Sequence, residues 1–187
     1  MHLAWDTLPA ALRHAVQGLR AEHSYLAQYE ELRRRSPWRP ALTQAQIDEV
    51  QPVVHPVVRT HPETGRKALF VSEHFTTRVV GIPEDESRAL LAELFAHSVL
   101  PEHVYRHRWA PHDLVFWDNR SLMHLAAGCP SHLRRKLYRT TIQGNAAIAL
   151  AIISMAHSLH MQVVAEGVEC AGRGSLGNVR RLRDFFN

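Results

Sequence analysis

The chain has 187 residues, of which 45% are hydrophobic, and its formal net charge is +4 from 22 basic and 18 acidic residues. This length supports one hydrophobic core, no apolar run is long enough to cross a membrane, and the first residues lack a secretion signal, so we expect a cytoplasmic protein. The basic residues cluster only at positions 33–35 and 180–183, without a nucleic-acid-binding motif, and nucleic acid is therefore not an expected partner.

The first fifty residues are predicted to be helical and polar. A helix is expected over residues 7–22, because apolar residues recur there at helical spacing and Pro9 suits a first turn. Residues 24–50 are rich in charged and amide side chains and contain two prolines. This pattern predicts a surface excursion with a short helix at residues 43–50.

Strand patterns dominate the middle of the chain. Residues 53–59 and 67–72 are largely apolar runs joined by a segment whose proline and glycine mark a turn, which predicts a hairpin. Residues 83–99 begin with three acidic residues and continue with leucines at helical spacing, which predicts a helix. Further short strands are expected at residues 104–109, 113–117 and 136–143. Because strands and helices do not alternate regularly, an antiparallel double-sheet roll is favoured over a βαβ array.

The pattern changes near Gly144. Residues 145–160 are rich in alanine and isoleucine at helical spacing, residues 162–165 suit a strand, and residues 166–169 suit a turn. A helix, strand and turn in this order are typical of α/β folds. The predicted fold is therefore mainly β with inserted helices, followed by a C-terminal α/β appendage.

Three residues of the second half form the candidate site. His124 follows the strand expected at residues 113–117, and Arg135 and Arg139 lie eleven and fifteen residues after it. On one strand, residues 135 and 139 point the same way, so both guanidiniums are expected to face one pocket. A charge-assisted hydrogen bond to an anion there contributes about 1.5–3 kcal/mol. An imidazole and two guanidiniums are suited to hold a metal and an anionic co-substrate.

These residues belong to a series of motifs that resembles the taurine dioxygenase (TauD/TfdA) family over residues 1–144. The motifs, in order, are His55-Pro56-Val57-Val58-Arg59-Thr60-His61-Pro62, Ala68-Leu69-Phe70-Val71, Phe75-Thr76-Thr77-Arg78, Trp117-Asp118-Asn119-Arg120, His124, Arg135 and Arg139. The resemblance implies an Fe(II)- and 2-oxoglutarate-dependent dioxygenase on a double-stranded β-helix, or jelly roll. In that family, two histidines and one carboxylate hold the iron.

The resemblance also implies a role for four residues. His124 corresponds to the distal iron ligand, and Arg135 to the guanidinium that binds the far carboxylate of 2-oxoglutarate. Arg139 corresponds to the residue that meets the acidic group of the substrate, which is a sulfonate in the taurine enzyme. Phe75 corresponds to an aromatic of the substrate pocket. The expected substrate is therefore taurine or another small sulfonate or organic acid.

Each of these residues also has a purely structural interpretation. A single histidine near a strand end is more often hydrogen-bonded than a metal ligand, and Arg135 and Arg139 also suit the outward face of an edge strand. Phe75 suits an ordinary core position. Residues 117–120 are expected to form a structural turn whose Asp and Asn side chains bond nearby backbone groups.

The sequence departs from the family at the other two iron ligands. In the family they belong to an HxD motif upstream of the segment that matches residues 1–6, and no HxD motif occurs in this sequence. The segment His61-Pro62-Glu63 is rejected as a substitute, because it falls in the expected hairpin turn. With two of three ligands missing, we expect weak iron binding and slow or absent turnover. Unpaired sheet edges predict association into a homo-oligomer.

Residues 146–170 resemble the EAL family of cyclic-di-GMP phosphodiesterases, most clearly in the string Val-Val-Ala-Glu-Gly-Val-Glu that ends at Glu169. In that family the glutamates matching Glu166 and Glu169 lie near a metal-assisted hydrolysis site. One helix and one strand cannot assemble that site, so no phosphodiesterase activity is expected. Residues 1–144 are thus interpreted as a partial dioxygenase domain and residues 145–187 as an appended tail. A catalytically inactive fusion remnant or interaction module is the alternative to a dioxygenase.

Overall fold

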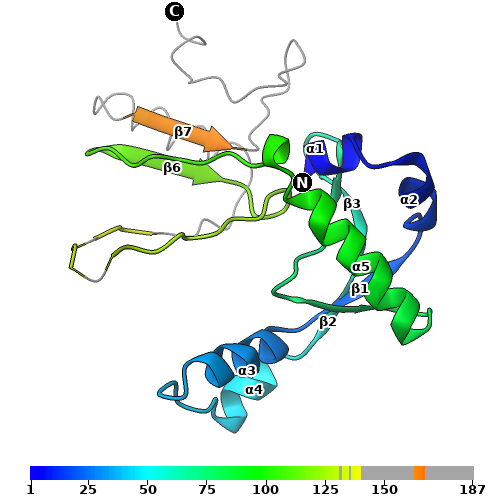
Figure 1. The fold of residues 1–187 in the computed structure, drawn as a ribbon, viewed down its shortest axis with the longest axis horizontal. Coiled ribbons are helices and arrows are strands. Elements are labelled where there is room, and N and C mark those ends of the chain that lie inside the picture. Colours follow the sequence, from blue (N-terminus) through cyan, green and yellow to red (C-terminus); the bar gives the residue numbers. More distant parts are fainter. Residues whose placement is uncertain (131, 135, 140–161, 167–187) are drawn as a thin grey trace, which may run out of the picture. The chain divides into compact units, whose positions relative to one another are not determined.

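The computed structural model describes residues 1–130, 132–134, 136–139 and 162–166, the last of these by backbone alone (Figure 1). The described elements, in chain order, are α1 (His2–Asp6), α2 (Ala10–Ala15), β1 (Arg20–His23), α3 (Tyr25–Arg35), α4 (Gln44–Glu49), β2 (Val53–Pro56), β3 (Val58–Thr60), β4 (Lys67–Leu69), β5 (Thr76–Val79), α5 (Glu84–Ser98), the 3-10 helix η1 (Pro101–His103), β6 (Asp113–Trp117) and β7 (Gln162–Glu166). The chain divides into two compact units, Met1–Arg106 and His107–Asn187, and each is described by itself.

The predicted helix over residues 7–22 is wrong in its second half. Helix α2 ends at Ala15, and Gly18 has a φ of 75°, a left-handed conformation that glycine adopts at little cost. Residues 20–23 then form β1, which pairs antiparallel with β2 on one side and with β5 on the other. Two ladders of backbone hydrogen bonds outweigh the helical spacing of the apolar residues.

The Gly18→Ala variant is expected to lower the free energy of unfolding by about 1 kcal/mol. No atom lies within 4 Å of a Cβ added at this position, so the cost comes from the positive φ and not from a clash. Urea unfolding of the two proteins measures the difference. An unchanged midpoint would mean that the turn relaxes to a negative φ without disturbing β1.

The three-stranded sheet, in the order β2-β1-β5, has one face in the core and one toward solvent. Ala21 of β1 is fully buried, whereas the next residue, Glu22, is opposite Arg78 of β5. The Glu22 carboxylate accepts hydrogen bonds from Arg78 Nη2 and from Thr77 Oγ1, each at 2.9 Å. These bonds tie β1 to β5 on the face away from the core.

Glu22 gives the stability of the first unit a predictable pH dependence. Hydrogen bonds from Arg78 and Thr77 lower the pKa of the Glu22 carboxyl below its ordinary value of 4.5. A carboxyl whose pKa is lowered by folding stabilises the native state above that ordinary value, and the stabilisation is lost as the pH falls through the lowered pKa. Glu22→Gln is therefore expected to decrease stability slightly at pH 7 and not at pH 2.

The measurement is urea unfolding of the Glu22→Gln variant at pH 7 and pH 2, with Glu93→Gln on the exposed side of α5 as the matched control. If wild type and Glu22→Gln differ by the same free energy of unfolding at both pH values, the ionised Glu22 carboxylate is not the source of the pH dependence.

The predicted hairpin is confirmed for β3 and β4, which pair antiparallel with Val58 opposite Leu69 and Thr60 opposite Lys67. The connecting turn contains Gly65, at a φ of 69°, whose N–H donates to the carbonyl of His61 at 2.9 Å. The first part of the strand predicted at residues 53–59 forms β2 and pairs with β1 instead.

Helix α5 confirms the helix predicted for residues 83–99 and covers the core of the first unit. The Ser87 hydroxyl of α5 accepts a hydrogen bond from the Val79 N–H at 2.7 Å, which joins the helix to the end of β5. The core combines α5 with α1, α2 and four strand regions. Its members are Ala4, Trp5, Leu8, Val16, Ala21, Val57, Leu69, Val71, Val79, Leu91 and Leu94.

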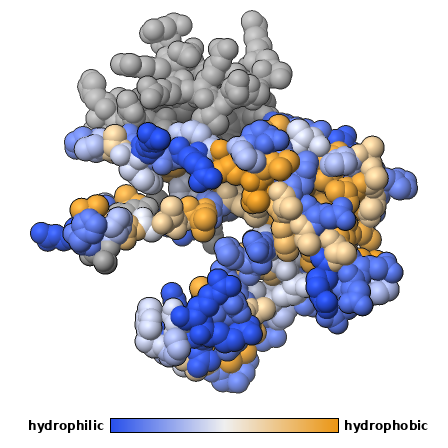
Figure 2. All heavy atoms as spheres, in the orientation of Figure 1, coloured by the Kyte–Doolittle hydropathy of each residue, from blue (hydrophilic) through white to orange (hydrophobic). Residues whose placement is uncertain are grey.

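The segment of residues 24–50 is a surface excursion, as predicted, but it contains two helices instead of one. Ser24 caps α3 by accepting a hydrogen bond from the Ala27 N–H at 3.1 Å, and Thr43 and Gln46 form a capping box on α4. Neither helix contains a buried residue. The pair projects from the sheet, and its visible face is mainly hydrophilic (Figures 1 and 2). Local capping therefore determines these helices more than packing does.

In the second unit, β6 and β7 pair in parallel, with Asp113 opposite Gln162 and Trp117 opposite Glu166. The strands predicted at residues 113–117 and 162–165 are confirmed. The strand predicted at residues 104–109 is wrong, because no described segment pairs with it, and residues 136–139 are likewise not a strand. The rest of the predicted strand at 136–143 and the predicted helix at 145–160 lie outside the described residues.

The turn predicted for residues 166–169 also falls beyond the described part, except that residue 166 ends β7. A parallel pair differs from the antiparallel neighbours that a roll would place there. Within the described residues, no helix combines the length and apolar character needed to cross a membrane.

Candidate active site

His124 lies on the second unit, seven residues after the end of β6. Its imidazole contacts the indole of Trp117, the last residue of that strand, with ring centroids 4.8 Å apart and planes tilted by 49°. His124 is otherwise exposed. The sequence interpretation treated Trp117 only as part of a turn and missed this contact, although an aromatic residue at a strand end next to a candidate ligand is a recognisable signal.

Side chains within the turn hold the segment between Trp117 and His124. Asp118 accepts hydrogen bonds from the backbone N–H of Arg120 at 2.8 Å and from its Nε at 2.9 Å. Trp117 Nε1 donates to Asn119 Oδ1 at 2.9 Å. The prediction of a structural turn at residues 117–120 is thus confirmed, and the turn fixes the indole against which His124 rests.

The electrostatic surroundings of His124 favour the neutral imidazole. Partial burial of the ring lowers its pKa below the ordinary value of 6.5, and the positive charge of Arg139 lowers the pKa further. At neutral pH the ring therefore carries a lone pair that can bind a metal or accept a proton.

Replacing Arg139 by glutamine is expected to raise the pKa of His124 toward its ordinary value, because a positive charge no longer opposes protonation. Partial burial of the ring still lowers the pKa of His124 in this variant, so the pKa does not return fully to its ordinary value. An NMR titration of the imidazole resonances measures the pKa. Lys136→Gln, which removes a cation three residues before Arg139 in the chain, is the matched control. Equal pKa values in the two variants would show that Arg139 is not the relevant charge.

Arg135, the predicted 2-oxoglutarate ligand, lies outside the described residues. Around it, Lys136 Nζ lies 5.0 Å from the ring centroid of Tyr138, and that ring is 87% exposed. Residues 136–139 do not form a strand. The alternation of side chains along a strand is therefore the wrong argument for expecting Arg135 and Arg139 to face one pocket.

Phe75 belongs to the first unit and precedes β5. Its N–H donates to the Ser72 carbonyl at 3.1 Å, and its carbonyl accepts from the Ser24 N–H at 2.8 Å. The side chain is 39% exposed, so the alternative of an ordinary core position is wrong. An exposed aromatic ring held by a fixed backbone is able to contact an apolar part of a ligand.

His61 has a structural role in the turn between β3 and β4. The residue is only 6% exposed, and its Nδ1 accepts hydrogen bonds from the Glu63 and Thr64 N–H groups, both at 3.3 Å. A ring nitrogen occupied by two backbone donors is not available to a metal. The segment of residues 61–63 is therefore a poor substitute for an HxD motif, as the sequence suggested.

The described residues do not fit an iron site. No group of three or more His, Cys, Asp or Glu side chains that could hold a metal ion occurs among them. The two neighbours that define the surroundings of His124 are an indole and a guanidinium, and neither ligates a cation. A facial triad needs a second histidine and a carboxylate beside His124, and the described part of the chain places no such pair there.

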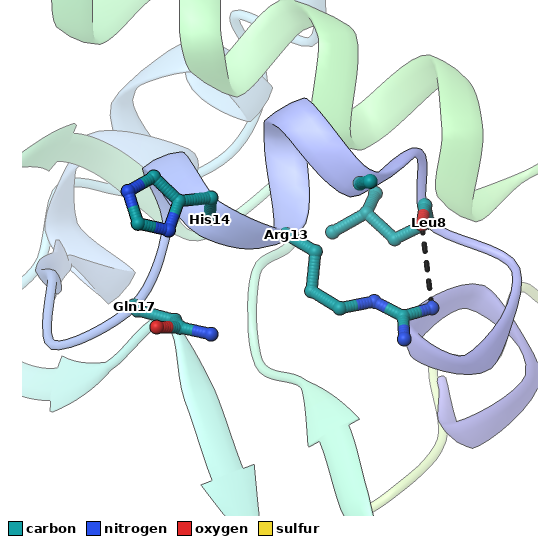
Figure 3. Close-up of a pocket in the computed structure, with 5 residues that line it drawn as sticks. Leu8, Arg13, His14 and Gln17 are labelled. Carbon is teal, nitrogen blue, oxygen red and sulfur yellow. Dashed lines mark hydrogen bonds between the residues drawn. The ribbon is translucent and has the colours of Figure 1, made fainter.

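A hollow of about 380 Å³ in the first unit is lined by Leu8, Ala10, Arg13, His14 and Gln17 (Figure 3). One guanidinium nitrogen is occupied, because Arg13 Nη2 donates to the carbonyls of Asp6 at 2.7 Å and of Leu8 at 3.3 Å, whereas Nε is buried without a partner among the described residues. These bonds hold the chain between α1 and α2. The hollow contains none of the predicted site residues, and its geometry is that of a helix connection.

Comparison with known proteins agrees with these motifs. Residues 1–141 match the family described as Taurine catabolism dioxygenase TauD, TfdA family. The chain is 41% identical over 148 residues to the alpha-ketoglutarate-dependent 2,4-dichlorophenoxyacetate dioxygenase of Cupriavidus pinatubonensis, covering 79% of this chain and 50% of that protein. It is 30% identical over 177 residues to an alkylsulfatase of Acinetobacter baylyi, covering 90% of this chain and 53% of that protein.

A similar solved structure is that of a candidate alpha-ketoglutarate dependent 2,4-D dioxygenase from Burkholderia xenovorans. The two share 38% sequence identity at a TM-score of 0.51, over 59% of this chain and 40% of that chain. The chain belongs to the TauD/TfdA family, which confirms the resemblance inferred from the motifs. It spans about half the length of the curated relatives that it matches.

Proposed function

We propose that this chain forms part of an Fe(II)- and 2-oxoglutarate-dependent dioxygenase of the taurine dioxygenase type, acting on a small organic acid or sulfonate. Residues 1–144 are the dioxygenase part, on an incomplete jelly roll. Family membership supports the cofactor and co-substrate, because members of this family use Fe(II) and 2-oxoglutarate. The observation that carries the proposal is the position of His124, whose ring rests 4.8 Å from the indole of Trp117 and is kept neutral by partial burial and by the charge of Arg139.

In this proposal, each site residue has one task. His124 provides one metal ligand, and its contact with Trp117 fixes the plane of the ring. Arg135 binds the far carboxylate of 2-oxoglutarate, and Arg139 binds the acidic group of the substrate through a forked pair of hydrogen bonds. Phe75 contacts the apolar part of the substrate. Because the described residues supply one iron ligand, we derive no catalytic step for the chain.

The substrate class follows from the charge of Arg139. A guanidinium selects an oxyanion but does not distinguish a carboxylate from a sulfonate. One relative is named for 2,4-dichlorophenoxyacetate and another as an alkylsulfatase, so both types of acid occur among similar proteins. Taurine, an alkyl sulfate and an aryloxyacetate are therefore the first substrates to test.

The alternative is a catalytically inactive remnant or interaction module, and one observation favours it: the described residues contain no group of three metal ligands. Similarity to the curated relatives favours the enzyme. The two proposals differ in whether His124 matters for the chemistry of 2-oxoglutarate.

Succinate formation from 2-oxoglutarate separates these proposals. The purified chain is incubated with Fe(II), ascorbate and each candidate substrate, next to His124→Ala and, as the matched control, His132→Ala, which removes an exposed histidine of the same unit. The enzyme proposal expects slow succinate formation that is lost in His124→Ala and kept in His132→Ala. Equal succinate in wild type and His124→Ala would defeat it.

A further inference from the structure

Two histidines meet on adjacent strands of the first unit. Ala21 of β1 is opposite His55 of β2, and His23 is opposite Val53, so His23 and His55 are diagonal neighbours on one face of the sheet. Their ring centroids lie 5.7 Å apart, and each ring centroid lies 5.4 Å from that of Phe70. The three rings form a small platform at the margin of the core.

One arginine completes this group. The Arg59 guanidinium carbon lies 4.4 Å from the ring centroid of Phe70, and the charge of Arg59 acts on both imidazoles. Arg20 lies on the opposite face of β1, next in alternation to Ala21, and its Nη2 donates to the Val54 carbonyl at 2.9 Å. We call His23, His55 and Arg59 the basic cluster.

The basic cluster has no compensating carboxylate within the described part of the chain. Arg59 makes no ion pair there, and Glu22, the carboxylate of β1, is bound by Arg78 and Thr77. His55 and Arg59 are half-buried, so solvent reaches the cluster. An uncompensated guanidinium beside an aromatic platform attracts anions and repels cations.

His23 adds a donor without an acceptor. Its Nδ1 lies 3.1 Å from the Thr76 hydroxyl, and that hydroxyl oxygen accepts from the Ser72 N–H at 2.8 Å. Since the Thr76 hydroxyl has no other acceptor among the described residues, the arrangement that satisfies both groups has Thr76 donating to Nδ1. The imidazole proton then lies on Nε2, which is buried without a hydrogen-bond partner. A buried N–H of this kind is stabilised by a nearby negative charge.

The protonation of the histidines agrees with this picture. Burial and the neighbouring cationic groups lower the pKa values of His23 and His55 below 6.5. At neutral pH both rings are uncharged and present N–H donors, and a bound anion would raise their pKa values again.

We propose that the basic cluster is a binding site for a small oxyanion of the carboxylate, phosphate or sulfate type. Arg59 and His55 donate directly to the anion, the buried Nε2–H of His23 adds a favourable dipole, and Phe70 forms the platform. This site belongs to the first unit, includes none of the predicted dioxygenase residues, and does not depend on the proposed function.

Sulfate is the probe, because its charge stays constant between pH 6 and 8 and any pH effect then comes from the protein. The thermal unfolding midpoint of the chain is measured against sulfate concentration at constant ionic strength. We expect a saturable rise that requires less sulfate at pH 6 than at pH 8. Arg59→Gln and His55→Gln are each expected to weaken the apparent affinity by about tenfold, the loss of one charge-assisted hydrogen bond.

Two controls separate the cluster from other effects. Arg78→Gln removes a cation of the same sheet that is already bound by Glu22, and Arg139→Gln removes the guanidinium that the proposed dioxygenase site offers to an oxyanion; both should respond to sulfate like wild type. Val53→Glu introduces a carboxylate opposite His23 and is expected to raise the midpoint without sulfate and to abolish the sulfate response. This variant keeps the test decisive if Arg59→Gln does not fold.

The proposal is overturned by an equal sulfate response in wild type, Arg59→Gln and Val53→Glu, which would mark a general salt effect. It is also overturned if sulfate has no effect while Ni²⁺ raises the midpoint and His55→Gln removes that rise, which would make the histidines a metal-binding pair.

Discussion

Titration of the 187-residue chain with Fe(II) in the presence of 2-oxoglutarate is expected to yield no stoichiometric complex. The described residues supply one imidazole, next to the positive charge of Arg139, and no group of three ligands. Loss of residues that only support metal ligands weakens binding by about 10–100-fold, so two absent ligands should weaken it by more than about 100-fold. The charge-transfer absorption of a chelated 2-oxoglutarate complex, recorded anaerobically, measures the outcome.

His124→Ala and His132→Ala are titrated in parallel with the wild-type chain. Weak absorption that is lost only in His124→Ala would identify His124 as a single ligand, as expected. A stoichiometric complex at micromolar Fe(II) would contradict the prediction and would require further ligands from outside the described residues.

The second large effect concerns the core of the first unit. Leu94→Ala is expected to lower the free energy of unfolding by about 2–5 kcal/mol, because Leu94 is fully buried and its loss leaves a cavity between α5 and the strands. Total stabilities of domains are about 5–15 kcal/mol, so this one change removes a large fraction. Urea unfolding, followed by circular dichroism, measures the difference.

Leu3→Ala is the matched control, because it deletes the same atoms from a side chain that is 47% exposed. Its effect is expected to stay within about 0.5 kcal/mol. Similar losses in the two variants would mean that α5 does not form the cover of the core.

Elements with a strong local pattern could be predicted from the sequence. Helix α5 carries three acidic residues in its first turn, and the hairpin of β3 and β4 has Gly65 where the turn needs a positive φ. Strand β1 could not be predicted, because Arg20–His23 has no strand pattern of its own. Its conformation comes from pairing with residues 53–56 and 76–79, which no local window contains.

In the candidate site, too, features with a local sequence motif could be predicted and features that depend on the path of the chain could not. The series of motifs that includes His124 identified the family, whereas the role of Arg139 stays a prediction. The contact between His124 and Trp117 depends on the path of the turn after β6, which residue spacing does not specify. Two members of the basic cluster, His55 and Arg59, belong to the motif of residues 55–62, but their meeting with His23 of β1 depends on the sheet and not on that motif.

The position of β1 in its sheet has a consequence for the order of folding. β1 is the central strand, yet both of its partners come later in the chain, at Val53–Pro56 and Thr76–Val79. During synthesis, β1 therefore leaves the ribosome with two open edges, and the sheet closes only after residue 79 has emerged. Until then the nascent chain exposes unpaired backbone groups, and this interval is when association with chaperones or with other chains competes with folding.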